Sequence, residues 1–129
     1  MTRQNLLITL CRSEVAPRFD MTAEVLLMPM PTLETLALPQ EQQEWRHLVL
    51  AHTSSEELCD HITRLDVAMV ICGGIEEDYY HYLRWKRIEV VSDVMGEVKD
   101  VLASLASGTL QSGDSLYPRR KGHDCQPPV

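Results

Sequence analysis

Hydrophobic residues in this sequence gather in short continuous runs that are separated by polar segments. The first run, NLLITLC at residues 5–11, is typical of a strand that is buried on both faces. Further runs at 23–30 and 46–52 predict a second and a third strand. The segment 31–44 mixes two prolines with glutamine and glutamate, so it predicts a connection, or at most a short strand around Leu36. The first half of the chain therefore predicts strands joined by loops.

Helical spacing of apolar residues begins in the segment 53–65. Thr53 stands three residues before Glu56, which is the spacing of a capping box at a helix N-terminus. The buried stripe of this helix would consist of Leu58, Ile62 and Leu65. Cys59 lies beside that stripe, so we expect it in the core.

Strands and helices alternate in the second half of the chain. The run VAMVI at 67–71 predicts a fully buried strand, and a Cys-Gly-Gly turn leads from it into a helix that begins near Glu76. A strand at 88–94 follows, and then a helix over 98–105 that Gly108 closes. Such alternation predicts βαβ units with right-handed crossovers, and hence an α/β domain with a partly parallel sheet.

Length and charge limit the possible functions. The 129 residues, 44% of them hydrophobic, fit one domain with its own core, which we place at residues 1–112 with a flexible tail at 113–129. With 12 Lys and Arg against 19 Asp and Glu, the formal charge of -7 argues against binding to nucleic acid or to an anionic membrane. No apolar run approaches the roughly 18 residues of a membrane span, and no secretory signal opens the chain, so we predict a cytoplasmic protein.

Motifs of the common enzyme classes do not occur in the sequence. There is no nucleophile elbow, no Walker-type phosphate loop and no His-x-x-x-His pair. A two-metal nuclease would need carboxylates on adjacent strand ends, whereas Asp20, Asp66 and Asp93 fall outside the predicted strands. We therefore expect a protein without catalytic activity.

Two of the four cysteines are candidate metal ligands. No CxxC pair is present, and free thiols or metal ligands are favoured over a disulfide framework. Cys72 and Cys11 each end a predicted strand, where ligands of α/β sheets collect, and thiolates are the usual ligands of iron-sulfur centres. For each cysteine the alternative is a small buried residue that fills the turn. A ligand role requires that the Cys72 thiol is open to solvent and lies beside Cys11.

The residues around these cysteines would complete a cofactor site. Gly73 and Gly74 allow close approach of the backbone, and amide N–H groups near a helix start favour an anionic cluster. The acidic residues 76–78 oppose a second anion, so Arg12 and Arg18 would have to compensate for them. The same acids also stabilise a helix N-terminus without any ligand.

Three segments resemble the dinitrogenase iron-molybdenum cofactor biosynthesis family, namely EVAPRFD at 14–20, VICGGI at 70–75 and GEVKDVLASLASGTL at 96–110. The resemblance extends over roughly residues 5–112. It rests on the order and spacing of a Pro-x-Phe-Asp loop, a Cys-Gly-Gly-Ile turn and a final helix that ends in a small residue and glycine. The chain departs from the family in having Arg18 where many members have histidine, and a cysteine at position 11 where they have none.

The resemblance implies a ribonuclease H-like three-layer α/β domain. Its mixed sheet would have five strands in the order 3-2-1-4-5, with strand two antiparallel and helices on both faces. It also implies a role in carrying or inserting an iron-sulfur or molybdenum-containing cluster, with a donor or acceptor protein of cofactor assembly as partner. Two thiolates hold half of a four-thiolate cluster, so a homodimer, exogenous ligands or a pre-formed cluster would supply the rest.

A second hypothesis places the function on an aromatic helix. Most of the aromatic residues lie in one helical segment, as Tyr79, Tyr80, Tyr82 and Trp85. Such a group indicates either an interface with a partner or a cover over the sheet edge. The sequence therefore leaves two functions open, a metallocluster carrier and a metal-free interaction module on the same fold.

Overall fold

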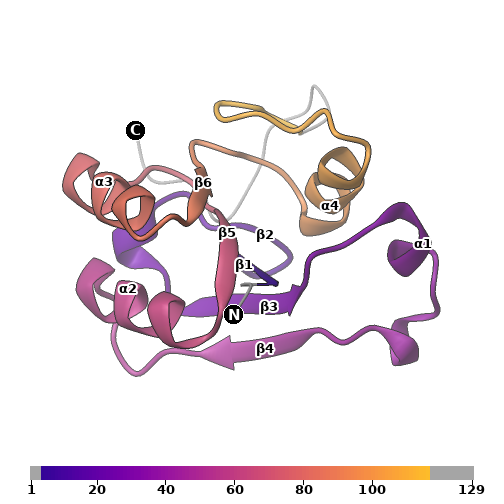
Figure 1. Cartoon of the computed structure of the whole chain (residues 1–129), viewed down its shortest axis with the longest axis horizontal. Helices are drawn as coiled ribbons and strands as arrows, with labels where there is room; N and C mark the ends of the chain where they lie inside the picture. The colour runs from indigo at the N-terminus through magenta and orange to yellow at the C-terminus, as the bar shows by residue number, and fades with distance from the viewer. Residues whose placement is uncertain (1–3, 117–129) are drawn as a thin grey trace.

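A six-stranded mixed sheet forms the centre of the computed structural model, which describes residues 4–116 (Figure 1). Five strands follow one another across it in the order β4 (Arg46–Val49), β3 (Glu24–Pro29), β1 (Asn5–Cys11), β5 (Val67–Ile71) and β6 (Glu89–Val91). The two-residue strand β2 (Glu14–Val15) pairs with β1 outside this path. β3 is antiparallel to β1 and to β4, whereas β5 is parallel to β1 and to β6.

The predicted mixed α/β sheet is confirmed, with a difference in its strands. The first and fourth predicted strands are parallel neighbours, since Ile8 of β1 is in register with Ile71 of β5. The sheet has six strands rather than five, because the two-residue β2 pairs with the end of β1 outside the path of the other five strands. In β2, Val15 pairs with Leu10 after a tight reversal. A two-residue strand leaves no period in the sequence, so the pattern did not indicate it.

Helices cover both faces of the sheet. On one face lie α2 (Ser55–Arg64) and α3 (Glu77–Trp85), and on the other lies α4 (Val98–Ala106) with the short α1 (Leu33–Leu36) beside it (Figure 1). Two 3-10 turns, Phe19–Met21 and Gln40–Gln42, lie in the loops. The strand β1 divides the core, because Leu7 packs under α2 and α3 while Leu6 and Ile8 pack under α4. No helix within residues 4–116 has the length and apolar character needed to cross a membrane.

Two element boundaries differ from the prediction. The cap of α2 is Ser54 rather than Thr53, and its hydroxyl accepts a hydrogen bond from the Glu57 N–H at 3.0 Å. Ser54 stands three residues before Glu57, so the two spacings could not be distinguished in the sequence. Residues 113–116, which the sequence places in the tail, pair with the segment before α4, where the Leu116 N–H donates to the Met95 carbonyl at 2.8 Å. The rest of the predicted tail lies outside the described residues.

Residues 12–22, which we call the rim loop, pack over the carboxyl end of β5. The Gly74 N–H donates to the Pro17 carbonyl, and the Phe19 N–H donates to the Gly74 carbonyl, each at 2.8 Å. Phe19 is fully buried in the core under α2 and α3. A Cβ on Gly73 would collide with the carbonyl groups of Ala16 and Pro17. The loop can therefore take this position only because residue 73 has no side chain.

Gly73→Ala is expected to destabilise the protein by about 3 kcal/mol or more, because backbone atoms of the loop must move away from the added methyl group. Gly74→Ala is the matched control, since its Cβ would meet nothing closer than the Pro17 carbonyl oxygen at 3.6 Å. We expect that control to change stability by less than about 1 kcal/mol. Urea unfolding of both variants measures the difference, and equal effects would show that the close approach is not needed.

Thr9, in the middle of β1, has a buried hydroxyl without a hydrogen-bond partner among the described residues. The residue is fully buried and pairs with Val25 of β3. A buried hydroxyl without a partner costs about 1–3 kcal/mol, because it loses its hydrogen bonds to water.

Thr9→Val is therefore expected to raise the free energy of unfolding by about 1 kcal/mol. Thr9→Ser, which keeps the hydroxyl and loses the methyl group, should instead lower it by about 1 kcal/mol. Denaturant titration of the two variants gives both numbers. A loss of stability in the valine variant would mean that the hydroxyl is satisfied in the folded protein.

Candidate functional site

The predicted metal ligand Cys72 lies one residue beyond β5, inside the core. Its N–H donates to the Val91 carbonyl at 3.0 Å, and its own carbonyl accepts from the Val94 N–H at 3.1 Å. Its side chain has no exposed surface and belongs to the same buried cluster as Phe19 and Leu83. The expectation of a thiol open to solvent is therefore wrong, because the rim loop and α3 cover this end of the strand.

Burial also controls the ionisation of Cys72. Loss of water around the sulfur raises the pKa of this thiol to about 12, and Asp93 and Cys59 add to the rise. At neutral pH the side chain is a protonated thiol, whereas a metal ligand must be a thiolate. Cys59 is the other free cysteine among residues 4–116, and it is also buried, as the sequence predicted.

The glycine turn is filled by the protein's own backbone. The Gly74 N–H, which we expected to be open to an anion, donates to Pro17, and the Gly73 carbonyl accepts from the Asp93 N–H at 2.9 Å. α3 begins only at Glu77, after the cap residue Glu76. The turn therefore does not present Gly74 to a ligand at the end of a helix.

The other predicted site residues do not converge on Cys72. Arg18 forms a bidentate ion pair with Asp20, in which Nε lies 3.0 Å from Oδ1 and Nη2 lies 2.7 Å from Oδ2. Arg12 lines a pocket with Leu10 and Val98, on the α4 side of the sheet. Cys11 ends β1, is half-buried and is disulfide-bonded, so it has no free thiol and the prediction of a thiolate ligand at this position is wrong. Within residues 4–116, no group of three or more His, Cys, Asp and Glu side chains is placed to hold a metal ion.

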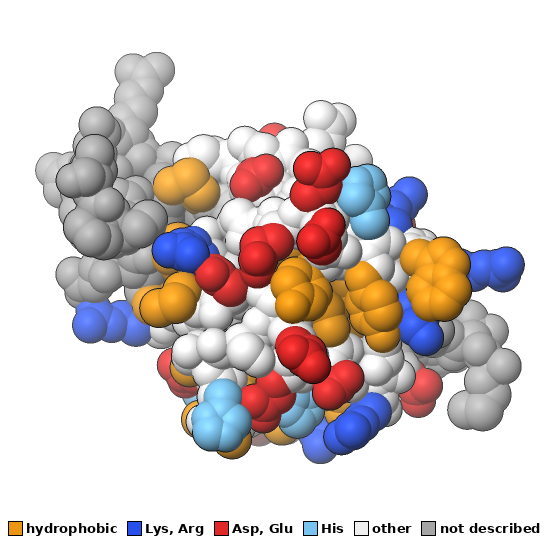
Figure 2. Space-filling model, turned by 90° about the vertical axis from the view of Figure 1, so that its left-hand side faces the viewer, with side chains coloured by type: hydrophobic (Ala, Val, Ile, Leu, Met, Phe, Trp, Pro, Cys, Tyr) orange, Lys and Arg blue, Asp and Glu red, His pale blue; other side chains and the backbone are white. Residues whose placement is uncertain are grey.

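A second candidate site lies between the helices α2 and α3, and we call it the α2–α3 groove. Its volume is about 530 Å³, and its lining consists of Glu56, Cys59, Asp60, Glu76, Asp78, Tyr79 and Tyr82. Figure 2 shows acidic and hydrophobic side chains next to one another on this end of the molecule. The groove thus combines an apolar wall with several carboxylates.

The carboxylates make the α2–α3 groove electrostatically negative. Glu76 accepts a hydrogen bond from the Ser55 hydroxyl at 3.0 Å, whereas Glu56, Asp60 and Asp78 form no ion pair with any described side chain. The pKa of Tyr79 is raised by partial desolvation and then by the charges of the neighbouring carboxylates. Carboxylates that are not neutralised attract a cation more strongly than those already paired.

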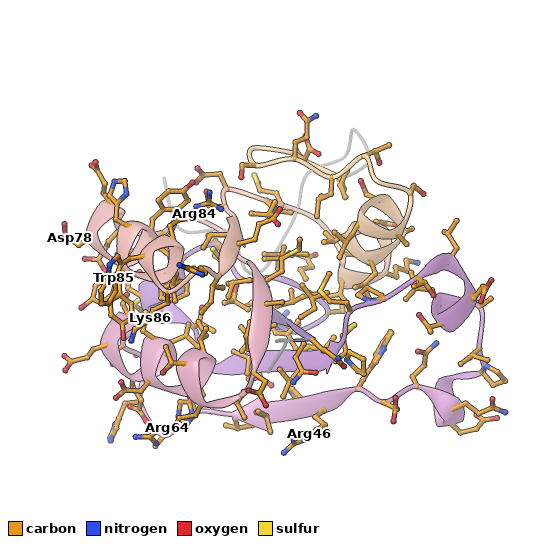
Figure 3. All side chains as sticks on the ribbon, in the orientation of Figure 1. Arg46, Arg64, Asp78, Arg84, Trp85 and Lys86 are labelled. Atoms are coloured by element: carbon orange, nitrogen blue, oxygen red, sulfur yellow. The ribbon has the colours of Figure 1, made fainter. Side chains whose placement is uncertain are left out.

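Exposed aromatic rings flank the groove on α3. Tyr82 is 37% exposed and Trp85 is 75% exposed. The Lys86 ammonium lies 5.8 Å from the centre of the Tyr82 ring and 5.2 Å from the Trp85 ring. Figure 3 shows Asp78, Trp85 and Lys86 at the same end of the molecule. Both rings are thus within cation–π range of a positive charge.

The sequence indicated only half of this groove. The aromatic residues of α3 predict an interface or a cover, whereas no local pattern connects the acids of α2 with them. Glu56 and Asp60 are four residues apart, so they lie on the same side of a helix. That spacing was the available signal, and the packing of α2 against α3 was the missing information.

Comparisons with known protein families and with curated proteins gave no match for this sequence.

Solved structures with a similar fold were found at low sequence identity. PH0822 matches with a TM-score of 0.66 and 17% identity, over 84% of this chain and 93% of that chain. A "putative dinitrogenase" from Methanocaldococcus jannaschii matches with a TM-score of 0.59 and 18% identity, over 86% and 95% of the two chains. A "putative NifB protein" from Thermotoga matches with a TM-score of 0.61 and 13% identity, over 91% and 99%. At these identities the likeness shows a shared fold and nothing further.

Proposed function

We propose that this protein is a non-catalytic accessory protein of metallocofactor assembly that acts by binding another protein, and that it does not hold a cluster on Cys72. The context is suggested by the names of the Methanocaldococcus jannaschii and Thermotoga proteins, which share the fold. The sequence resemblance to the cofactor biosynthesis family points in the same direction. The observation that carries the proposal is the complete burial of Cys72.

The residues at the rim do not fit a cluster. A cluster on Cys72 would need a thiolate, and burial, which raises the pKa of this thiol to about 12, makes that thiolate more costly to form than at an exposed cysteine. It would also need space, and that space holds Phe19 and the hydrogen bonds between the rim loop and Gly74. Opening the site would require breaking these contacts and exposing Phe19 to water, which is a large cost for a single ligand.

The α2–α3 groove supports protein binding as the mode of action. Large exposed aromatic side chains beside charged ones are typical of binding surfaces. Tyr82 and Trp85 are exposed on α3, at the same end of the molecule as the groove carboxylates, which form no ion pair within residues 4–116. A donor or acceptor protein of cofactor assembly is the partner that this proposal names.

Metal reconstitution tests the first half of the proposal. The full chain is incubated without oxygen with iron and sulfide, or with molybdate, and metal content and visible absorption are measured after desalting. We expect the parent and Cys72→Ala to retain equal amounts of metal. Cys59→Ala is the matched control, because Cys59 is also a buried free cysteine but does not lie at the rim. A cluster that is lost in Cys72→Ala and kept in Cys59→Ala would contradict the proposal.

The pH dependence of stability tests the burial of Cys72. An unfolded thiol ionises near pH 9.0, whereas the folded one ionises near pH 12, so the unfolded state releases its proton first. The contribution of the buried thiol is therefore fully present below about pH 9 and is lost as the pH rises toward 12, by about 1.4 kcal/mol per pH unit.

We expect stability to fall less steeply above pH 9 in Cys72→Ala than in the parent. Urea unfolding at several pH values between 8 and 10.5 measures both slopes. Cys59 remains in both proteins and contributes the same fall to each. Identical slopes would mean that the Cys72 thiol already ionises freely in the folded protein.

A further inference from the structure

The geometry points to the α2–α3 groove as a docking site for an arginine- or lysine-rich segment of a partner protein. This inference rests on the proposed function, because the groove acts only if another protein binds. The occupant is inferred from charge, since four carboxylates line the groove and none of them forms an ion pair within residues 4–116.

Spacing favours a peptide over a single ion. On α2, Glu56 and Asp60 are separated by one helical turn, which is about 6 Å along the axis. Side chains two residues apart on an extended peptide are about 6.6 Å apart and point to the same side. Alternate basic side chains of an extended segment can therefore reach both carboxylates of α2 at once. Glu76 and Asp78 face the same groove from the α3 side.

The aromatic residues add a second interaction that also favours a positively charged occupant. A cation over an aromatic face gains about 0.5–1 kcal/mol at an exposed site, and arginine makes this contact more often than lysine. Tyr79 and Tyr82 line the groove, and the Lys86 ammonium already lies within 5.8 Å of the Tyr82 ring centre. An arginine in the groove would thus find both a carboxylate and a ring face.

The groove has room for this occupant. A volume of about 530 Å³ exceeds that of a single side chain, so one or two basic side chains fit together with a stretch of backbone. Cys59 and Tyr79 provide an apolar floor for the aliphatic stems of arginine or lysine. Basic residues also occur in the chain itself, at Arg119, Arg120 and Lys121, and the experiment separates the two sources.

The test uses a short fluorescein-labelled peptide of alternating arginine and glycine, and the same peptide with glutamine in place of arginine. Fluorescence anisotropy with the full chain measures the dissociation constants at low and at physiological salt. We expect the arginine peptide to bind and the glutamine peptide not to bind. Amide chemical-shift changes on titration should be concentrated in α2 and α3.

Two matched triple variants distinguish the effect of the groove carboxylates on peptide affinity from the effect of the net charge of the protein. Glu56→Gln with Asp60→Asn and Asp78→Asn removes three charges from the groove. Glu34→Gln with Glu89→Gln and Asp100→Asn removes three exposed charges elsewhere.

We expect a loss of affinity of about tenfold for the groove variant and of less than about threefold for the distal one. Circular dichroism checks that both are folded. Equal losses would overturn the inference, because binding would then follow net charge alone.

A third variant, Arg119→Gln with Arg120→Gln and Lys121→Gln, tests the chain's own basic segment. If the groove binds a segment of a partner protein, this variant should bind the arginine peptide with the same affinity as the parent. A clear gain in affinity would overturn the inference in favour of the chain's own tail as occupant. Retention of a cluster on Cys72 would refute the proposed function, but the peptide-binding results could still be interpreted independently of it.

Discussion

The close approach of the rim loop to the glycine turn after β5 is the contact on which this end of the molecule depends. Two hydrogen bonds join the loop to Gly74, and the missing side chain of Gly73 leaves space for the carbonyl groups of Ala16 and Pro17. Because the backbone is held there, Phe19 enters the core under α2 and α3. Burial of Cys72 follows from the same contact, since the residue lies directly beneath it.

This contact changes the meaning of the Cys-Gly-Gly sequence. Cysteine followed by two glycines at a strand end resembles a ligand site, because glycine permits close approach of a bound group. Here the group that approaches is the protein's own loop. Gly73 serves packing between two segments of the chain, and Cys72 is a small apolar residue that fills the space below them. Function must then be sought on the outer surface of the helices.

The parts of the fold that follow from periodicity could be predicted from the sequence, and the parts that follow from tertiary contacts could not. Continuous apolar runs correctly predicted β1 and β5, and their parallel pairing followed from the alternation of strands and helices. β2 could not be predicted, because two residues carry no period. The burial of Cys72 could not be predicted either, since it depends on the path of a loop that is far away in the sequence.

The same limit applies to the candidate site. The aromatic residues on α3 form a group that is visible in the sequence. The helix carries more aromatic residues than one buried stripe can hold, and part of the group is therefore exposed. Their connection with Glu56 and Asp60 needed the packing of α2 against α3, which no local pattern contains. Residues that act together across two helices are therefore the hardest part of this protein to find from its sequence.

The two tryptophans of the chain lie in different surroundings. Trp85 is 75% exposed on α3, near the groove, whereas Trp45 packs against the core on the α4 side. Indole emission depends on contact with water, so red-shifted light comes mainly from Trp85 and the blue-shifted part from Trp45. The protein thus carries an intrinsic optical reporter for each side of its sheet, and events at α3 can be followed without any label.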